Sequence, residues 1–375
     1  MALLRALLLL VVIRIVSSML AALALALFLG EAARAAPDNP PAVAPQSGPL
    51  DSEMGFSFPS IKTRRALSGI ACPVSKSNER LCLAVFDEGA EARHLTINGE
   101  AYVPDNEQVA LRPGNIELDA EAAATDGAFY YVAGSHSAKR NDCANNPESR
   151  HVIRFRVDPK SGRALRNVRG TLVDYADTDR LWSIMATTAQ LQAHVGDSMC
   201  LGTEPPGDAP QLTGRRGINI EGLAVKNGRL FFGFRGPVDD GRAHILAVNA
   251  DGLFSGKDAR PARVSVNVGK GRAIRDLLAV SDGVLVLSGP DDDEKNSSVG
   301  WVVSRWDGQE TSDPEGQIKT LATLDLSNVK LRSCDHEPRP EALAITADKP
   351  GEAYQALIFS DGMCDGGALR FTIPR

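Results

Sequence analysis

Carboxylate side chains recur at equivalent positions along this chain. Four short apolar segments each begin with an acid, and these acids are Glu121, Glu221, Asp276 and Glu341. Ser68 stands at the head of a fifth, weaker copy of the segment. If the fold gathers the four carboxylates, a bound cation, raised pKa values or paired arginines must compensate their repulsion. Oxygen ligands in this number favour Ca²⁺ over a transition metal, so we predict a calcium site formed by these acids.

Polar residues also end the second strand of each copy, and they are Asp87, His136, Arg235, Ser288 and Asp361. We expect Arg235 to hold an anionic group of a substrate and His136 to act as the base, which makes both catalytic candidates. The other three are expected to bind the ligand. The competing interpretation is structural, because an acid at a strand head can accept backbone amides of the next unit. A histidine in a turn can equally be a surface residue.

These positions belong to a repeat that predicts the fold. Each copy consists of two apolar strands joined by a turn, and Asn227-Gly228, Asp126-Gly127 and Asp282-Gly283 supply the positive φ that tight hairpins need. Two further strand-like runs follow the hairpins, as at His244–Val248 and Arg263–Val268. Four strands per unit, with the first two the most apolar, are typical of a propeller blade. We predict an all-β fold, a β-propeller with five recognisable four-stranded blades, and six blades are the alternative.

Two places depart from the simple repeat. The long interval between the second and third copies contains Asp179–His194, whose pattern indicates a helix, so we predict a helical insertion near residues 174–215. In the second unit we expect the outer strand at Gly170–Val173. The last unit lacks a fourth strand after Phe371–Ile373, and we expect Met54–Phe58 to supply it and so cover the free edge.

The N-terminal segment is typical of a secretory signal peptide. A basic residue precedes two apolar runs, which Arg14 separates, and Ala33-Arg34-Ala35 is a small-x-small cleavage site. We therefore assign residues 1–35 to a signal peptide, 36–53 to a disordered linker rich in proline, and 54–375 to the propeller domain. An uncleaved membrane anchor is the alternative, although the second run is short for a span. We expect a periplasmic or secreted protein with no membrane span in the mature chain.

The cysteines point to the same compartment. All six lie after the predicted cleavage site, and an even count in an exported chain favours disulfides. The repeat narrows the pairing, because it places the cysteines in pairs at the ends of one hairpin or on one rim of the propeller. We predict the disulfides Cys72–Cys82, Cys143–Cys200 and Cys334–Cys364.

The charge of the chain excludes some partners. The sequence contains 41 Lys and Arg against 47 Asp and Glu. Removal of residues 1–35 takes away three arginines and one glutamate, which leaves 38 against 46 and a net charge of −8. A chain this acidic is not expected to bind nucleic acid or an anionic membrane surface. We expect instead a monomer with a small-molecule or peptide ligand at one face of the propeller.

Two motifs resemble a known family. Asn219-Ile-Glu-Gly-Leu-Ala224, followed by Phe232-Gly-Phe-Arg-Gly-Pro237, is similar to an uncharacterised family of exported bacterial proteins, a domain of unknown function, over residues 60–375. More distantly, the Glu-Gly-Leu-Ala heads resemble the esterase-like and phytase-like β-propellers. That resemblance implies acids at the mouth that hold calcium for a phosphate ester, with Glu221 and Glu341 at the matching positions. The longer acidic signatures of the phytases are absent from the chain.

Two functions from different classes follow from these observations. The first is a calcium-dependent hydrolase of phosphate or carboxylic esters, in which the metal would polarise the ester and lower the pKa of a bound water. The second is a non-catalytic propeller of the cell envelope that binds a ligand or a protein. The fold alone does not choose between them, since propellers host many functions.

Overall fold

The structure is a computed structural model that describes residues 40–52, 54–73, 79–99, 101–140, 142–201, 216–292, 296–310 and 318–375. The predicted signal peptide, residues 1–35, lies outside these residues. The chain divides into two compact units, Met1–Pro40 and Pro41–Arg375. The second unit contains every described helix and strand.

Five sheets make up the second unit. The first is β2 (Leu67–Ala71), β3 (Glu79–Phe86), β4 (Glu91–Asn98) and β5 (Ala101–Ala110). The second is β6 (Ala120–Thr125), β7 (Phe129–Gly134), β8 (Val152–Arg156) and β9 (Ala176–Thr178). The third is β10 (Asn219–Lys226), β11 (Arg229–Asp239), β12 (Arg242–Asn249) and β13 (Ala262–Asn267). The fourth is β14 (Arg272–Val280), β15 (Gly283–Pro290), β16 (Trp301–Trp306) and β17 (Ile318–Leu324), and the fifth is β18 (Arg339–Ala347), β19 (Tyr354–Asp361) and β20 (Leu369–Ile373).

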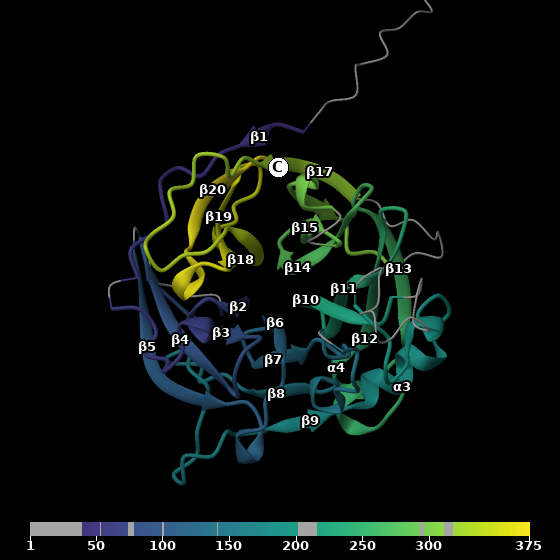
Figure 1. Cartoon of the computed structure of the whole chain (residues 1–375). Coiled ribbons are helices and arrows are strands. Elements are labelled where there is room, and N and C mark those ends of the chain that lie inside the picture. Colours follow the sequence, from purple (N-terminus) through teal and green to yellow (C-terminus); the bar gives the residue numbers. More distant parts are fainter. Residues whose placement is uncertain are drawn as a thin grey trace, which may run out of the picture. The chain divides into compact units, whose positions relative to one another are not determined.

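The first strands of the five sheets surround a common axis. Strand β2 contacts β6, β6 contacts β10, β10 contacts β14, β14 contacts β18, and β18 returns to β2 (Figure 1). Within each sheet the strands follow one another outward in chain order and pair antiparallel. The prediction of a propeller with five blades is therefore confirmed.

Burial on both faces explains why the inner strands are continuously apolar. Every residue of β15 is buried, and so is every residue of β10 except the last. The turn between β10 and β11 has positive φ at Asn227 and Gly228, 53° and 73°, as the hairpin motif predicts. Apolar side chains fill the space between neighbouring blades, where for example the rings of Phe231 and Trp306 meet edge to face at 5.3 Å.

An N-terminal strap, residues 41–51, covers the edge of the last blade. Strand β1 (Ala42–Val43) pairs parallel with β17, and the backbone amides of Gln46 and Leu50 donate to carbonyls of Arg370 and Ala368, both at 2.9 Å. The prediction that Met54–Phe58 supplies the missing strand is wrong, and the expected linker is not free from residue 41 onward. The reason is that the outer carbonyls of β20 need donors, which the strap provides.

The second blade also differs from expectation. Its outer strand is Ala176–Thr178, whereas Leu172 bridges to Arg166 within a local hairpin. The predicted helix is shorter than the sequence pattern: α3 spans Arg180–Thr187, and a separate turn of 3₁₀ helix, η3, covers Gln192–His194. The part of the expected insertion at 202–215 lies outside the described residues.

Short helices complete the described chain: α2 (Ile61–Arg64), α4 (Ala250–Ser255), η1 (Pro113–Asn115), η2 (Pro147–Ser149), η5 (Ser297–Val299) and η6 (Cys364–Gly366). Among the described residues, no helix has the length and hydropathy that crossing a membrane requires.

Candidate functional site

A pocket of about 770 Å³ lies at the mouth of the axis where the inner strands begin and the second strands end. Its lining comes from the blades formed by β2–β5, β6–β9 and β18–β20, from α2, from the loops beside them and from Asn219 at the start of β10. The charged residues that line it are Lys62, Arg65, Asp87, Glu88, Glu117, Asp119, Glu121, Lys139, Arg140, Glu148, His336, Arg339 and Asp361. This composition suits a polar or charged ligand.

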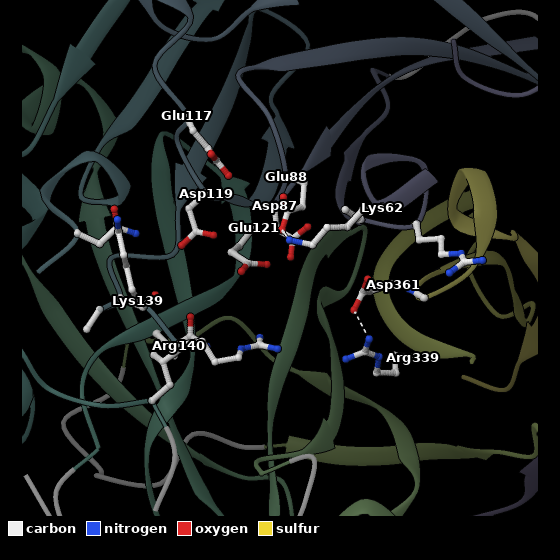
Figure 2. A pocket seen from close by; sticks show the side chains of 18 of the residues that line it. Lys62, Asp87, Glu88, Glu117, Asp119, Glu121, Lys139, Arg140, Arg339 and Asp361 are labelled. Atoms are coloured by element: carbon white, nitrogen blue, oxygen red, sulfur yellow. Dashed lines mark hydrogen bonds and ion pairs between the residues drawn. The ribbon is translucent and has the colours of Figure 1, made fainter. Parts of the chain in front are cut away.

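An acidic wall forms one side of the pocket and consists of Asp87, Asp119 and Glu121 (Figure 2). Asp87 follows the end of β3, whereas Asp119 and Glu121 stand at the start of β6. The Oδ1 atom of Asp87 is buried and has no hydrogen-bond partner among the described residues. The carboxyl group of Glu121 likewise has no hydrogen bond or ion pair within the described part of the chain.

Burial raises the pKa values of these three acids. It raises the pKa of Asp87 well above its ordinary value, and the charges of Asp361 and Asp119 add to the effect. Burial also raises the pKa of Glu121 well above its ordinary value, followed by the charge of Asp119. The pKa of Asp119 rises to about 6 through burial, although a hydrogen bond from Ser135 opposes the shift. Burial therefore favours the protonated form of Asp87 and Glu121, which can donate protons, whereas Asp119 with its pKa of about 6 is mostly ionised near neutral pH.

Cationic side chains face the acids. Arg339 binds Asp361 at 3.0 Å and Glu337 at 3.2 Å, and Lys62 forms an ion pair with Glu88. Arg140 is exposed and makes no hydrogen bond within the described chain, yet its charge opposes the rise in the pKa values of Asp87 and Asp119. Figure 2 shows Arg140 and Lys139 on a side of the pocket away from Glu117 and Glu88. An anionic group of a ligand would find its partners here.

A buried ion network stands next to this pocket. Arg275 is fully buried and its Nη1 atom donates to Glu221 at 3.0 Å and to Glu341 at 2.9 Å. Arg235 donates to the other oxygen of Glu221 at 2.9 Å. Asn219, which lines the pocket, donates to Glu221 at 3.1 Å and so connects the network to the pocket wall. Arginine pairing is therefore the compensation that the fold uses for these two carboxylates.

Other sequence candidates have partners in the fold. Asp276 is buried, and its carboxylate accepts the backbone amides of Leu277 at 2.7 Å and of Leu343, on the next blade, at 2.6 Å. Ser288 is buried and donates to the carbonyl of Val302 at 3.4 Å. For Asp276, these hydrogen bonds agree with the alternative interpretation of the sequence, in which an acid at a strand head accepts backbone amides of the next blade.

His136 lies behind the pocket wall rather than in it. Its side chain is 1% exposed, and Nδ1 lies 2.9 Å from the carbonyl oxygen of Gly134. Burial lowers its pKa to about 4, so the imidazole is neutral at physiological pH. His136 is not among the residues that line the pocket, and this geometry gives it no contact with a ligand there.

The structure thus divides the candidates. Asp87, Glu121 and Asp361 line one pocket, whereas the other candidates lie outside its lining: Glu221, Asp276, Glu341, His136, Arg235 and Ser288. Sequence reasoning missed Asp119 and Arg140. The signal for Asp119 was its place one residue before β6, two positions from Glu121.

The predicted calcium ligands do not form one coordination shell. Glu221 and Glu341 share Arg275, and Asp276 is saturated by amides, so three of the four carboxylates already have partners. Calcium stays a prediction. Among the described residues, one set of potential ligand atoms lies within 4.8 Å of one another, and it is Cys334, Asp335 and Cys364.

Two predicted disulfides are confirmed, Cys72–Cys82 and Cys143–Cys200. The third is not formed, since Cys334 and Cys364 are free thiols. Their Sγ atoms lie within 4.8 Å, but the Cys364 thiol donates to the carbonyl of Cys334 at 3.0 Å. The Cys364 backbone amide is held by Asp335 at 2.9 Å, so this loop fixes the thiol toward the carbonyl.

Solved structures with similar coordinates include several enzymes. An α-L-arabinofuranosidase from Lactobacillus brevis is 10% identical, with a TM-score of 0.42, over 83% of this chain and 90% of that one. A GH43_1 enzyme from Xanthomonas citri complexed with xylose is 10% identical, with a TM-score of 0.39, over 88% and 90%. Hydrazine synthase from Kuenenia stuttgartiensis is 12% identical, with a TM-score of 0.33, over 79% of this chain, which spans 63% of that structure. Scores at this level support no inference about activity.

Sequence comparison gives a firmer result. No curated protein matches the chain. The model of one protein family, DUF3616, described as a protein of unknown function, matches residues 69–366. This match covers nearly the whole propeller, from β2 to η6. The chain belongs to the DUF3616 family.

Proposed function

We propose that this propeller is a hydrolase of small polar esters, carboxylic or phosphate, and that the reaction takes place in the axial pocket. The observation that carries the proposal is a pair of carboxyl groups, Asp87 and Glu121, that have no partner among the described residues and lie in a pocket that also offers cations. A carboxyl group that is buried without a hydrogen-bond partner costs stability, and such groups cluster at functional sites.

The proposed roles follow from charge and protonation. Burial raises the pKa values of Glu121 and Asp87 well above their ordinary values and so favours the protonated form, from which either group can protonate a leaving alkoxide. Arg140 and Arg339 can hold the anionic part of the substrate. Asp361, already fixed by Arg339, would orient that guanidinium. The proposed ligand is a small molecule at one propeller face, which is one of the two classes, small molecule or peptide, expected from the sequence.

Two disulfides support an oxidising compartment for this activity. We therefore retain export to the periplasm or the medium as part of the proposal.

The test is a panel of carboxylic and phosphate esters, assayed with the purified mature protein in added calcium, in chelator and in neither. Turnover of at least one ester is expected. Loss of that turnover in chelator, with restoration by calcium, would support the calcium prediction, and unchanged turnover would contradict it. As a matched surface control, Glu352→Gln should leave the rate unchanged, because Glu352 is 64% exposed and pairs only with Lys349 in the described contacts.

The same panel tests the non-catalytic alternative. Each ester and its product acid are also added in a thermal-shift measurement, since a ligand that binds the folded state raises the melting temperature. A melting shift without turnover of any ester would contradict the hydrolase proposal and identify a binding propeller.

A further inference from the structure

Two serines, Ser135 and Ser137, extend a chain of hydrogen bonds from Asp119 of the acidic wall. Ser135 follows β7, and its hydroxyl donates to Oδ2 of Asp119. The Ser137 hydroxyl lies 2.8 Å from the Ser135 hydroxyl. Ser137 and Asp119 both line the pocket, whereas Ser135 does not. The three side chains therefore form a chain of hydrogen bonds whose two ends reach the ligand space.

The direction of this chain follows from counting protons. A hydroxyl has one proton, and Ser135 gives its proton to Asp119. Ser135 also accepts the backbone amide of Ser137 at 3.1 Å. The hydroxyl of Ser137 must then donate to Ser135, because Ser135 has no second proton to offer. Ser137 is thus polarised toward the carboxylate through one intermediate hydroxyl.

The backbone around Ser137 is held in one conformation. His136 has a positive φ of 57°, which turns the chain sharply between the two serines. The backbone amide of His136 donates to the carbonyl of Ser149 at 3.1 Å, and the Ser149 hydroxyl donates to the carbonyl of Ser137 at 3.1 Å. At Gly134 a Cβ atom would lie 2.2 Å from the Ser149 carbonyl oxygen, so the close approach requires glycine. The role of the buried His136 is therefore structural, because it forms the turn between the two serines.

We propose that Ser137 is the nucleophile of the pocket and that Ser135 and Asp119 carry away its proton. This inference rests on the proposed ester hydrolysis and names its covalent step. Ser135 is a positioning residue, since it acts on the substrate only through Ser137. Activation of a serine by a general base is a common device of nucleophilic catalysis. Here the base is Asp119, which reaches Ser137 through the Ser135 hydroxyl.

The reaction balances in two steps. Ser137 Oγ bonds to the carbonyl carbon of the ester, its proton passes to Ser135, and the Ser135 proton passes to Asp119. The alcohol leaves with the proton of the Glu121 carboxyl group, which leaves an acyl group on Ser137. Water then attacks the acyl carbon and returns a proton to Glu121, while Ser137 leaves and regains its proton along the same path. The products are the acid and the alcohol, and no other reactant is consumed.

A fluorophosphonate probe tests this inference without knowledge of the natural substrate. The probe reacts covalently with activated serines, and peptide mass spectrometry locates the label. We expect one labelled residue, Ser137, and no label in Ser137→Ala. Asp119→Asn and Ser135→Ala should each slow labelling by about 100-fold, the usual contribution of a general base. Ser137→Cys should accept iodoacetamide instead, which keeps the test valid if the alanine variant misfolds.

The chain supplies a matched control at another site. Ser281 also donates to a carboxylate, Asp348, at 2.9 Å, but it is exposed and lies outside the pocket lining. Ser281→Ala should leave the labelling rate of Ser137 unchanged. No label at Ser137, equal labelling of Ser281, or labelling of Ser137 that is indifferent to Asp119→Asn would overturn the inference.

Turnover separates this inference from the function on which it rests. Ester hydrolysis that persists in Ser137→Ala would refute the nucleophile and leave the hydrolase intact. A label on Ser137 in a protein that turns over no ester would support the nucleophile and refute the proposed reaction class.

Discussion

At the scale of single residues, Arg275 is shared by two glutamates, Glu221 and Glu341, that the repeat places close to the axis. Both glutamates are buried, Glu221 4% and Glu341 7% exposed. Burial raises the pKa of Glu341 well above its ordinary value, the charges of Asp361 and Glu221 add to this, and Arg275 opposes it. The arginine thus keeps the buried ion network next to the pocket compatible with a folded protein.

Replacement of this arginine should be costly. Arg275→Met leaves two buried carboxylates without their shared cation, so we expect the free energy of unfolding to fall by about 3–5 kcal/mol. Part of the lost stability should be regained on acidification, because acid protonates the two glutamates. Lys270→Met is the control, since Lys270 and Asp240 are both more than four-fifths exposed and 3.9 Å apart. Equal denaturation midpoints for the two variants would contradict the role given to Arg275.

Glu121 gives a pH dependence with a definite sign. Its ordinary pKa is 4.5, and burial raises the pKa in the folded protein. The unfolded chain therefore ionises first, so the contribution of Glu121 to stability is complete below pH 4.5 and is lost as the pH rises through the folded pKa. We expect Glu121→Gln to melt at a higher temperature than the natural protein at pH 8 and at nearly the same temperature at pH 4. A difference that shrinks with rising pH would show that Glu121 has a charged partner.

At the scale of elements, the loop after β7 depends on a disulfide. Cys143–Cys200 closes a segment with a sequence separation of 57 and lies between Arg140 and Leu201, which both line the pocket. Cys72–Cys82 closes a segment of 10 residues within the first hairpin. The longer cross-link restricts the unfolded chain more.

The two disulfides should therefore differ in effect. We expect the Cys143→Ala, Cys200→Ala double variant to lose about 4 kcal/mol and the Cys72→Ala, Cys82→Ala variant about 3 kcal/mol, as loop-closure entropy predicts. Chemical denaturation measures both. The first variant should also weaken ligand binding, because it frees the loop that carries Arg140, and the second should not. The reverse order on both measures would contradict this account.

The elements show what the sequence could predict. Hairpins such as β10–β11 and β14–β15 can be predicted from apolar runs and Asn-Gly or Asp-Gly turns, because their conformation is locally determined. The outer strand Ala176–Thr178 does not, since pairing with β8 rather than composition makes it a strand. Ser137 was missed for a similar reason. Its significance comes from Asp119, which precedes it by a whole hairpin.

At the scale of the whole propeller domain, repetition places the strand heads around one axis, and this much followed from the sequence. The sequence did not predict which acids at the strand heads reach the pocket, because this depends on the partner that each acid contacts in the fold. Glu121 meets none in the described chain, Glu221 meets two arginines, and Asp276 meets amides of the next blade. Partners such as Arg275 and the backbone amide of Leu343 are distant in the sequence from the acids that they contact, whereas the local sequence pattern around the three acids is the same.

The N-terminal strap joins the fourth, fifth and first blades, with the carbonyl of Asp51 accepting the backbone amide of Tyr102. A variant without residues 1–40 should melt as the full mature chain does. A variant without residues 1–51 should melt several degrees lower, because it loses the buried Leu50, a change that costs about 2 kcal/mol or more. Equal melting temperatures would show that the strap does not stabilise the ring.

The most direct test of the account concerns the acidic wall. In the Asp87→Asn, Glu121→Gln double variant, the two carboxyl groups that have no partner among the described residues become neutral amides of similar shape. We predict that kcat/KM for the best ester falls by about 100-fold or more while the melting temperature at pH 8 stays the same or rises, because these groups serve chemistry at the expense of stability. An unchanged kcat/KM in a folded variant would contradict the claim that the reaction takes place in this pocket.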